Sequence, residues 1–222
     1  MEDQTKSEVR YGGILLSVGA LITICCILLE VNAGWASLFI EMERTNYEAG
    51  KFLFENWDEM HGIWTGALIG NVFFTIASVL LMKNATKIGW FPSSLFWSIF
   101  FIGSWLLILS FGISLGSYYP ALDVIDNHPY VFNTIRGVAL YLFGYGALFQ
   151  LSVLIIYFQQ GFSTMGIVPR GYAILTLVLL AGAFVLGISS IVSFTVFAIV
   201  CFLVPLLLGI GYLRETVNEI GQ

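Results

Sequence analysis

Long, continuous runs of apolar residues alternate with short polar stretches along the 222 residues of this chain. Several runs reach the ~18–20 residues that an α-helix needs to cross the hydrocarbon core of a bilayer. They lack the period-two alternation of a membrane β-barrel, and an open sheet would leave backbone groups unpaired in lipid. The pattern therefore predicts an all-α fold, a polytopic transmembrane helical bundle. The six expected spans cover about residues 12–34, 62–82, 93–116, 137–158, 171–192 and 194–213.

Composition supports a membrane protein with one domain. Hydrophobic residues make up 58% of the chain and charged residues 10%, with a mean hydropathy of +0.89. A soluble domain carries about a quarter charged residues. The spans account for most of the chain, so residues 1–222 are expected to form a single transmembrane domain. No small-residue cleavage site follows the first apolar run, which is therefore expected to be a retained anchor.

The distribution of lysine and arginine between the loops predicts the orientation, because cytoplasmic loops carry an excess of both. With the N-terminus inside, the inner side holds six such residues and the outer side three. The inner residues are Lys6, Arg10, Lys83, Lys87, Arg170 and Arg214, and the outer ones are Arg44, Lys51 and Arg136. Both termini are therefore expected in the cytoplasm.

On this topology the outer face is acidic. Its carboxylates are Glu41, Glu43, Glu48, Glu55, Asp58, Glu59, Asp123 and Asp126. Together with a net charge of −5, this argues against a nucleic acid partner.

The longest loop, residues 41–61, follows the first span. Its second half, EAGKFLFENWDEM, places aromatic side chains among charges. That mixture predicts a short helix in the outer membrane interface, with its aromatics at headgroup level. A polar connector whose aromatics cap the bundle fits equally well, and both interpretations stay open here.

Histidine stands beside carboxylates in two stretches, NWDEMHG at residues 56–62 and DVIDNHPYVFNTIR at residues 123–136. Both are expected on the outer side, so they could meet. Two imidazoles with carboxylates suit zinc or another divalent ion, which could activate water. The candidate ligands are Asp58, His61, Asp123, Asp126 and His128. The simpler alternative is a helix start at Asp126 or Asn127 before Pro129, with the carboxylate capping free backbone N–H groups.

Few polar side chains lie within the expected spans. An ionisable group in lipid is energetically costly, so each one is a candidate functional residue. Glu30 and Arg136 lie at a similar depth near the outer edge and carry opposite charge, which predicts an ion pair between the first and fourth spans. The alternative is that each side chain reaches the interface alone. Asn71 and Gln150 lie deeper and are expected to bond across helices.

Small and helix-breaking residues indicate how the helices pack. Glycines recur every fourth position, which gives flat faces that let helices approach closely, here within one chain. These glycines are Gly62, Gly66, Gly70, Gly112 and Gly116. In the last span, Pro205 removes one helical hydrogen bond, so it predicts a bend that is either a moving hinge or static.

Three segments carry a resemblance to a known family. RYGGILLSVGALI near the start, IVPRGYAILTLVLLAGAFVLG entering the fifth span and FLVPLLLGIGYLRE near the end resemble a family of uncharacterised six-span bacterial integral membrane proteins. The resemblance implies a multi-pass protein of a bacterial inner (plasma) membrane. It implies no catalytic residue, because that family has no established activity.

Three functional classes follow. The absence of a catalytic constellation favours a non-catalytic membrane protein that acts as a subunit, partner or regulator. The alternatives are a small-molecule transporter or permeability protein, using Asn71, Gln150 and Pro205, and a metal-dependent hydrolase at the outer surface, using His61 and His128. No cofactor is expected, and no haem, because neither histidine lies within a span. The expected partners are the lipid bilayer and other membrane proteins, with a homo-oligomer left open.

Overall fold

The computed structural model describes residues 2–35, 46–88, 92–163, 166–187 and 191–220. These residues form helices and contain no strand, so the all-α prediction is confirmed for them. The helices are α1 (Glu2–Asn32), α3 (Asn46–Glu55), α4 (Trp57–Ile88), α5 (Pro92–Leu122), α6 (Pro129–Gln150), α7 (Ser152–Phe162), α8 (Arg170–Gly187) and α9 (Ile191–Ile220).

Five helical stretches among these residues are long and apolar enough to cross a membrane. They are Gln4–Asn32, Trp57–Ala85, Ser93–Leu122, Pro129–Phe162 and Val196–Arg214. Helices α6 and α7 form one of these stretches, because only Leu151, itself in a helical conformation, separates them. The predicted fifth span corresponds to α8, whose apolar part Arg170–Ala183 is shorter than the others. The protein is therefore a helical membrane protein, since a bundle of such helices can satisfy its backbone inside lipid.

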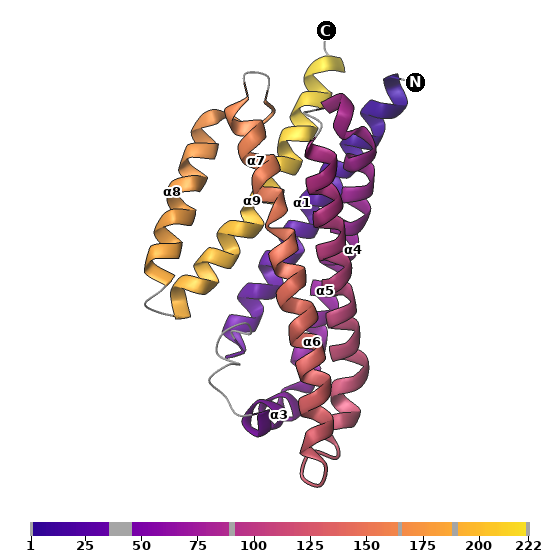
Figure 1. Ribbon diagram of the computed structural model, residues 1–222, viewed down its shortest axis with the longest axis vertical. Helices are drawn as coiled ribbons and strands as arrows, with labels where there is room; N and C mark the ends of the chain where they lie inside the picture. The colour runs from indigo at the N-terminus through magenta and orange to yellow at the C-terminus, as the bar shows by residue number, and fades with distance from the viewer. Residues whose placement is uncertain (1, 36–45, 89–91, 164–165, 188–190, 221–222) are drawn as a thin grey trace.

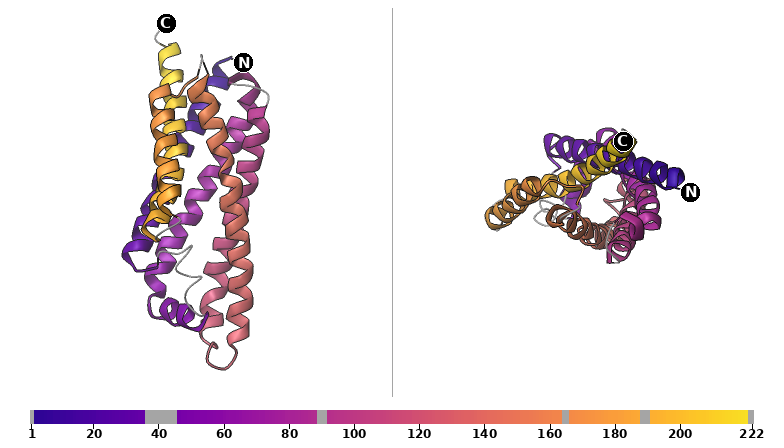
Figure 2. Two further views of the ribbon diagram at one scale, coloured as in Figure 1. Left: turned by 60° about the vertical axis from the view of Figure 1, so that its left-hand side comes forward. Right: turned by 90° about the horizontal axis from the view of Figure 1, so that it is seen from above.

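The helices pack side by side along one long axis (Figure 1). Helix α4 packs between α1 and α5, α5 also packs against α6, and α1 packs against α9. Seen from above, these helices are arranged in a ring (Figure 2). Helix α8 packs on the outside against α9, and the two helices meet part-way along the bundle (Figures 1 and 2).

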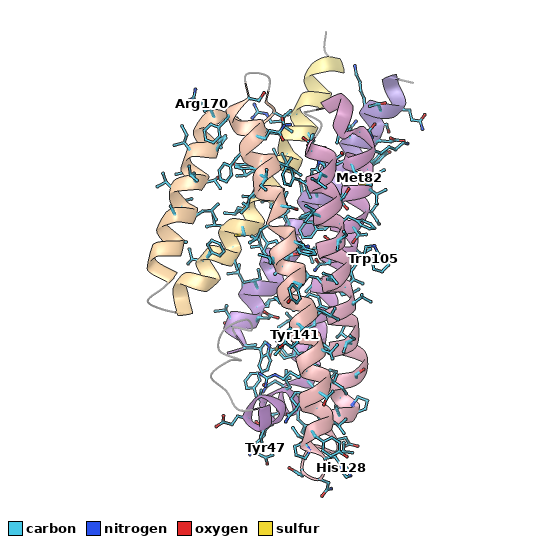
Figure 3. The ribbon with its side chains drawn as sticks, viewed as in Figure 1. Tyr47, Met82, Trp105, His128, Tyr141 and Arg170 are labelled. Atoms are coloured by element: carbon cyan, nitrogen blue, oxygen red, sulfur yellow. The ribbon has the colours of Figure 1, made fainter. Side chains whose placement is uncertain are left out.

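The chain termini share one end of the bundle (Figure 1). Arg170 and Met82 lie toward that end, whereas Tyr47 and His128 lie at the opposite end (Figure 3). At the terminal end, the ammonium of Lys83 lies 2.6 Å from the carboxylate of Glu8, which links α4 to α1. The turn between α5 and α6, marked by His128, therefore lies at the opposite end of the bundle from the start of α8, marked by Arg170 (Figure 3).

Helix α3 covers the end opposite the termini (Figure 1). Ala49 and Leu53 are fully buried, and the ring of Phe52 stacks on Trp35 at a centroid distance of 5.3 Å. A short helix therefore follows the first span, and its place in the membrane interface stays a prediction. Its buried face favours the interpretation in which this segment caps the bundle.

Buried apolar side chains form two clusters along the bundle. One, around Phe74 and Trp97, lies toward the termini, and the other, around Trp64 and Phe132, lies toward α3. The clusters are where the helices pack tightly, and burial of such side chains is the main source of contact energy within the chain. The interior between them is less completely filled, as described below.

Only some of the predicted glycines lie at a close contact between helices. A Cβ atom added at Gly66 would lie 2.9 Å from Cys26 Sγ, and one added at Gly70 would lie 2.8 Å from Thr23 Oγ1. These two glycines therefore allow α4 to approach α1 closely. Within the described residues, no atom lies within 4 Å of a Cβ added at Gly62, Gly112 or Gly116. Those three glycines face open space, so packing inside this chain does not explain them.

Other close approaches were not predicted. A Cβ added at Gly103 on α5 would lie 2.8 Å from the carbonyl oxygen of Gly146 on α6. One added at Gly13 on α1 would lie 2.9 Å from the carbonyl oxygen of Gly209 on α9. These glycines do not recur at a fixed spacing in their own helices, so the repeat pattern could not reveal them.

Candidate functional site

A cavity of about 370 Å³ lies between the two buried clusters. Residues of α1, α4, α5, α6, α7 and α9 line it. Most of its wall is apolar, with aromatic rings from Phe100, Phe111, Phe143, Phe197 and Phe202. A volume of this size with an apolar wall and few polar groups is typical of a site for a small molecule.

A hydrogen-bonded polar network forms part of the wall. The amide nitrogen of Gln150 donates to Oδ1 of Asn71 across 2.8 Å and to Oγ of Ser104 across 3.0 Å. Asn71 donates in turn to the carbonyl of Ala67, and Ser104 to the carbonyl of Phe100. The predicted bonding of Asn71 and Gln150 across helices is therefore present. Gln150 and Asn71 both line the cavity, so they bring polar groups to an otherwise apolar wall.

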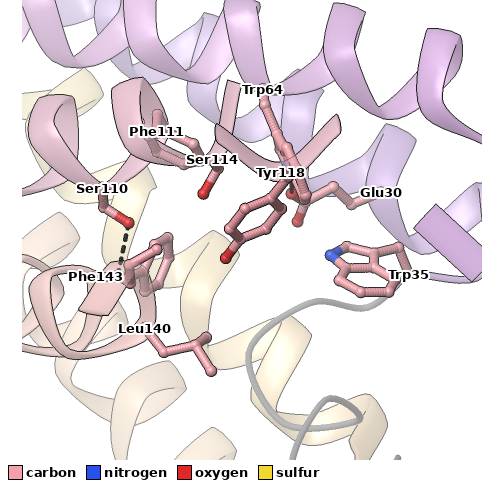
Figure 4. A pocket seen from close by; sticks show the side chains of 10 residues that line it. Glu30, Trp35, Trp64, Ser110, Phe111, Ser114, Tyr118, Leu140 and Phe143 are labelled. Carbon is pink, nitrogen blue, oxygen red and sulfur yellow. Dashed lines mark hydrogen bonds between the residues drawn. The ribbon is translucent and has the colours of Figure 1, made fainter. Parts of the chain in front are cut away.

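A smaller chamber of about 40 Å³ adjoins the cavity (Figure 4). Glu30, Phe111 and Phe143 line both spaces, so these three side chains form the boundary that the chamber and the cavity share. The chamber also contains the hydroxyl groups of Ser114 and Tyr118 and the indole of Trp35 (Figure 4). It is therefore a more polar space next to the mainly apolar cavity.

Glu30 and two tryptophans define the chemistry of the chamber. Glu30 is only 9% exposed, and its carboxylate accepts a hydrogen bond of 2.9 Å from Trp64 Nε1. Trp35 is 2% exposed, and its Nε1 has no hydrogen-bond partner within the described residues. Its indole nitrogen is on the side of the ring that faces the chamber (Figure 4). A buried N–H without an acceptor costs about 1–3 kcal/mol, which calls for a physical explanation.

The predicted partner of Glu30, Arg136, is also buried, at 2% exposed, and lies on α6. Ala139 and Leu140, one turn further along α6, line the chamber together with Glu30. Both charged side chains are thus held inside the bundle, not directed to the interface. The ion pair between them stays a prediction.

The two histidine stretches do not assemble a metal site in the described part of the chain, where no three His, Cys, Asp or Glu side chains lie close enough to hold an ion. His61 instead packs against the ring of Trp57, at a centroid distance of 5.8 Å. His128 Nδ1 lies 3.4 Å from the hydroxyl of Tyr130. Asp58 and Asp123 join no such group either. The hydrolase hypothesis therefore has no geometric support.

The expected carboxylate cap at the start of α6 is wrong. His128 occupies the N-cap position, and no side chain makes a capping hydrogen bond there. Asp126 accepts a hydrogen bond of 3.4 Å from the hydroxyl of Tyr47 instead. Pro129 lowers the need for a cap, because proline at the first helical position has no N–H to satisfy.

Pro205 lies inside α9, is buried and lines the cavity. The loss of one helical hydrogen bond at this residue thus occurs in the cavity wall. The two predicted alternatives at Pro205, a moving hinge and a static bend, both stay predictions. Cys26 on α1 and Cys201 on α9 also line the cavity, whereas the neighbouring Cys25 is exposed outside it.

Sequence reasoning missed the chamber. Trp35, Trp64 and Tyr118 come from three different segments, and none stands in a recognisable motif. Only Glu30 gave a signal, as a rare carboxylate near the end of an apolar run.

No protein-family model, curated protein or solved structure matches this chain. The resemblance to a six-span bacterial family stays a prediction. The function is therefore argued from the geometry of the interior site.

Proposed function

We propose that this protein is a non-catalytic, multi-pass membrane protein that binds a small, mainly apolar molecule in its interior cavity. In this proposal, ligand binding governs its action as a subunit, partner or regulator of other proteins in the same membrane. The observation that carries the proposal is the cavity of about 370 Å³ among six packed helices, which is partly open to the outside because Val31 and Leu148 in its lining are exposed. Well-packed interiors contain few voids larger than a water molecule, so a space of this size is a feature to be explained.

The lining supports a bound molecule that is mostly apolar. Aromatic and aliphatic side chains dominate the wall, and the polar side chains are few: the hydrogen-bonded pair of Asn71 and Gln150, and Glu30. Such a combination provides affinity through apolar burial and orientation through hydrogen bonds. A lipid bilayer supplies molecules of this kind at high local concentration.

The proposal includes six spans with both termini in the cytoplasm of a cell that has an inner (plasma) membrane. Helix α8 has 18 residues, about 27 Å at 1.5 Å per residue, which supports counting it as a span. Arg170 lies near the end of the bundle that holds the termini (Figure 3), and Lys83 pairs with Glu8 near the start of α1. An excess of positive charge is typical of the cytoplasmic side. Helix α3 then lies at the outer interface.

The cavity can be tested through its cysteines. In phosphatidylcholine nanodiscs, N-ethylmaleimide should label Cys201, and decyl-chain amphiphiles should slow this labelling by occupying the cavity. Gly144→Leu should abolish the protection, because Gly144 lines the cavity and has no atom within 4 Å of an added Cβ in the described residues. Labelling is followed by mass spectrometry.

Gly137→Leu is the matched control. Gly137 lies on the same helix, is not part of the cavity lining, and also has open space around an added Cβ within the described chain. In this variant, decyl-chain amphiphiles should protect Cys201 from labelling as well as they do in the unmodified protein. Equal protection in both variants, or none in the unmodified protein, contradicts the proposal.

Transport is the second candidate function, favoured by one observation. Pro205 stands in the cavity wall of α9, where a bend can change access to the interior. A transporter should expose Cys201 to a charged, membrane-impermeant thiosulfonate from each side of a liposome. Reaction from one side only contradicts transport and leaves the binding function.

A further inference from the structure

The chamber beside the cavity has its own chemistry, which specifies one end of the bound molecule. A water molecule needs about 10–15 Å³ of such space, so the chamber of about 40 Å³ holds a headgroup of a few atoms. The larger cavity then holds the apolar chain. Glu30, Phe111 and Phe143 line both spaces, and the bound molecule extends past these side chains from one space into the other.

The indole of Trp35 requires a hydrogen-bond acceptor in the chamber. Its Nε1 is buried without a partner in the described structure, and the nitrogen side of its ring faces the chamber (Figure 4). Trp35 is held in this orientation by stacking on Phe52 and by an edge contact with Trp64 at 6.2 Å. The ring is therefore positioned before any ligand arrives, and its N–H is directed to a headgroup oxygen.

Glu30 selects the charge of that headgroup. Its carboxylate is buried at the junction of chamber and cavity, where water screens charge poorly. A carboxylate headgroup has no N–H or O–H to donate to Glu30. A quaternary ammonium would suit the aromatic rings but carries no acceptor for Trp35. A hydroxyl group accepts from Trp35 and donates to a carboxylate or to Ser114, so it satisfies both requirements.

We infer that the bound molecule is a neutral, hydroxyl-bearing amphiphile, with its hydroxyl group in the chamber between Trp35 and Glu30 and its apolar chain in the cavity. This inference rests on the proposed ligand-binding function. It adds the substrate class: an alcohol of the membrane, in preference to an acid or an amine with the same chain.

The test compares three probes with one chain length: decanol, decanoate and decyltrimethylammonium. Each is added to the full-length protein in phosphatidylcholine nanodiscs, and the concentration that halves the labelling rate of Cys201 is measured. Decanol should act at the lowest concentration, after correction for the partitioning of each probe into empty nanodiscs. Trp35→Phe keeps a ring to stack on Phe52 but removes the N–H, so it should raise the half-effective concentration of decanol about five-fold.

Trp105→Phe is the matched control, because Trp105 is exposed on α5 and does not line either space. It should leave the response to decanol unchanged. The three probes are ranked on the unmodified protein. This ranking therefore tests the preference for a hydroxyl headgroup even if a variant does not fold.

The outcomes separate the inference from the function on which it rests. If decyltrimethylammonium or decanoate protects Cys201 best, or if Trp35→Phe binds decanol as well as the unmodified protein does, the hydroxyl headgroup is wrong while the ligand-binding cavity stands. If no decyl probe protects Cys201, both the inference and the proposed function are wrong.

Discussion

Gln150 and Asn71 are 79 residues apart in the chain, and the amide nitrogen of Gln150 donates to Oδ1 of Asn71 across 2.8 Å. The same nitrogen donates to Ser104, so one side chain joins α6 to both α4 and α5. In lipid, where no hydrophobic force favours one apolar neighbour over another, such bonds help to specify which helices associate. The network therefore fixes the alignment of three helices at the wall of the cavity.

A double-mutant cycle should measure this bond. Gln150→Ala and Asn71→Ala should each lower the free energy of unfolding, and their coupling should be about 0.6–1.7 kcal/mol, the range found for hydrogen bonds between membrane helices. Reversible unfolding in mixed detergent micelles gives these values. Thr134→Ala is a control, because Thr134 is exposed and bonds only within its own helix among the interactions described here. A coupling near zero would show that the two amides do not act together.

Trp64→Phe should destabilise the protein by about 1–3 kcal/mol, because it removes the indole N–H that donates to the buried carboxylate of Glu30. The loss should be smaller when Glu30 is replaced by Leu in the same protein, since no carboxylate is then left to satisfy. Thermal unfolding of the single and double variants checks this. Equal losses in both backgrounds would mean that Trp64 acts through packing alone.

Gly70→Ala should destabilise by about 1–3 kcal/mol, because the added methyl group would lie 2.8 Å from Thr23 Oγ1 and force α4 away from α1. Gly112→Ala is the matched comparison and should be neutral or stabilising by up to about 1 kcal/mol, since no described atom lies within 4 Å of its added Cβ and alanine favours a helix. Unfolding in detergent distinguishes them. The same response at both sites would contradict the packing described for α1 and α4.

Pro205→Leu should raise stability by roughly 1 kcal/mol and weaken protection of Cys201 by decanol. The substitution restores an N–H that can donate to the carbonyl of residue 201, and so straightens α9. Pro205 lines the cavity, so a straighter helix changes the shape of the site. A gain in helix stability at the expense of binding is expected where a bend serves function. Unchanged protection would show that the bend does not shape the cavity.

The sequence predicted the class of the molecule and most of its helices. Apolar runs of the right length are a local property of the chain, and a bilayer leaves such runs few other structures to adopt. The mixture of aromatic and charged residues after the first span was consistent with a short helix, but it fitted a polar connector equally well. The predicted pairing of Asn71 with groups on other helices followed from the cost of leaving an amide unpaired in lipid.

The same reasoning failed where the outcome depended on which helix faces meet. Gly66 and Gly112 look alike in sequence, yet one lies against Cys26 and the other faces open space. His61 and His128 lie near carboxylates in the chain, yet aromatic rings are their described neighbours. Helix rotation and side-by-side order are set by the summed packing of many side chains, which no short motif records.

The sequence alone thus determined a helical membrane protein with short loops, because the transfer of apolar segments into lipid is decided segment by segment. Only the tertiary structure decided that Glu30, Trp35 and Tyr118, from separate parts of the chain, surround one chamber. Only it decided that the bundle leaves a cavity of about 370 Å³ beside them. The physical reason is that a void is a property of how helices fit together: it appears where the side chains of several helices do not fill the space between them.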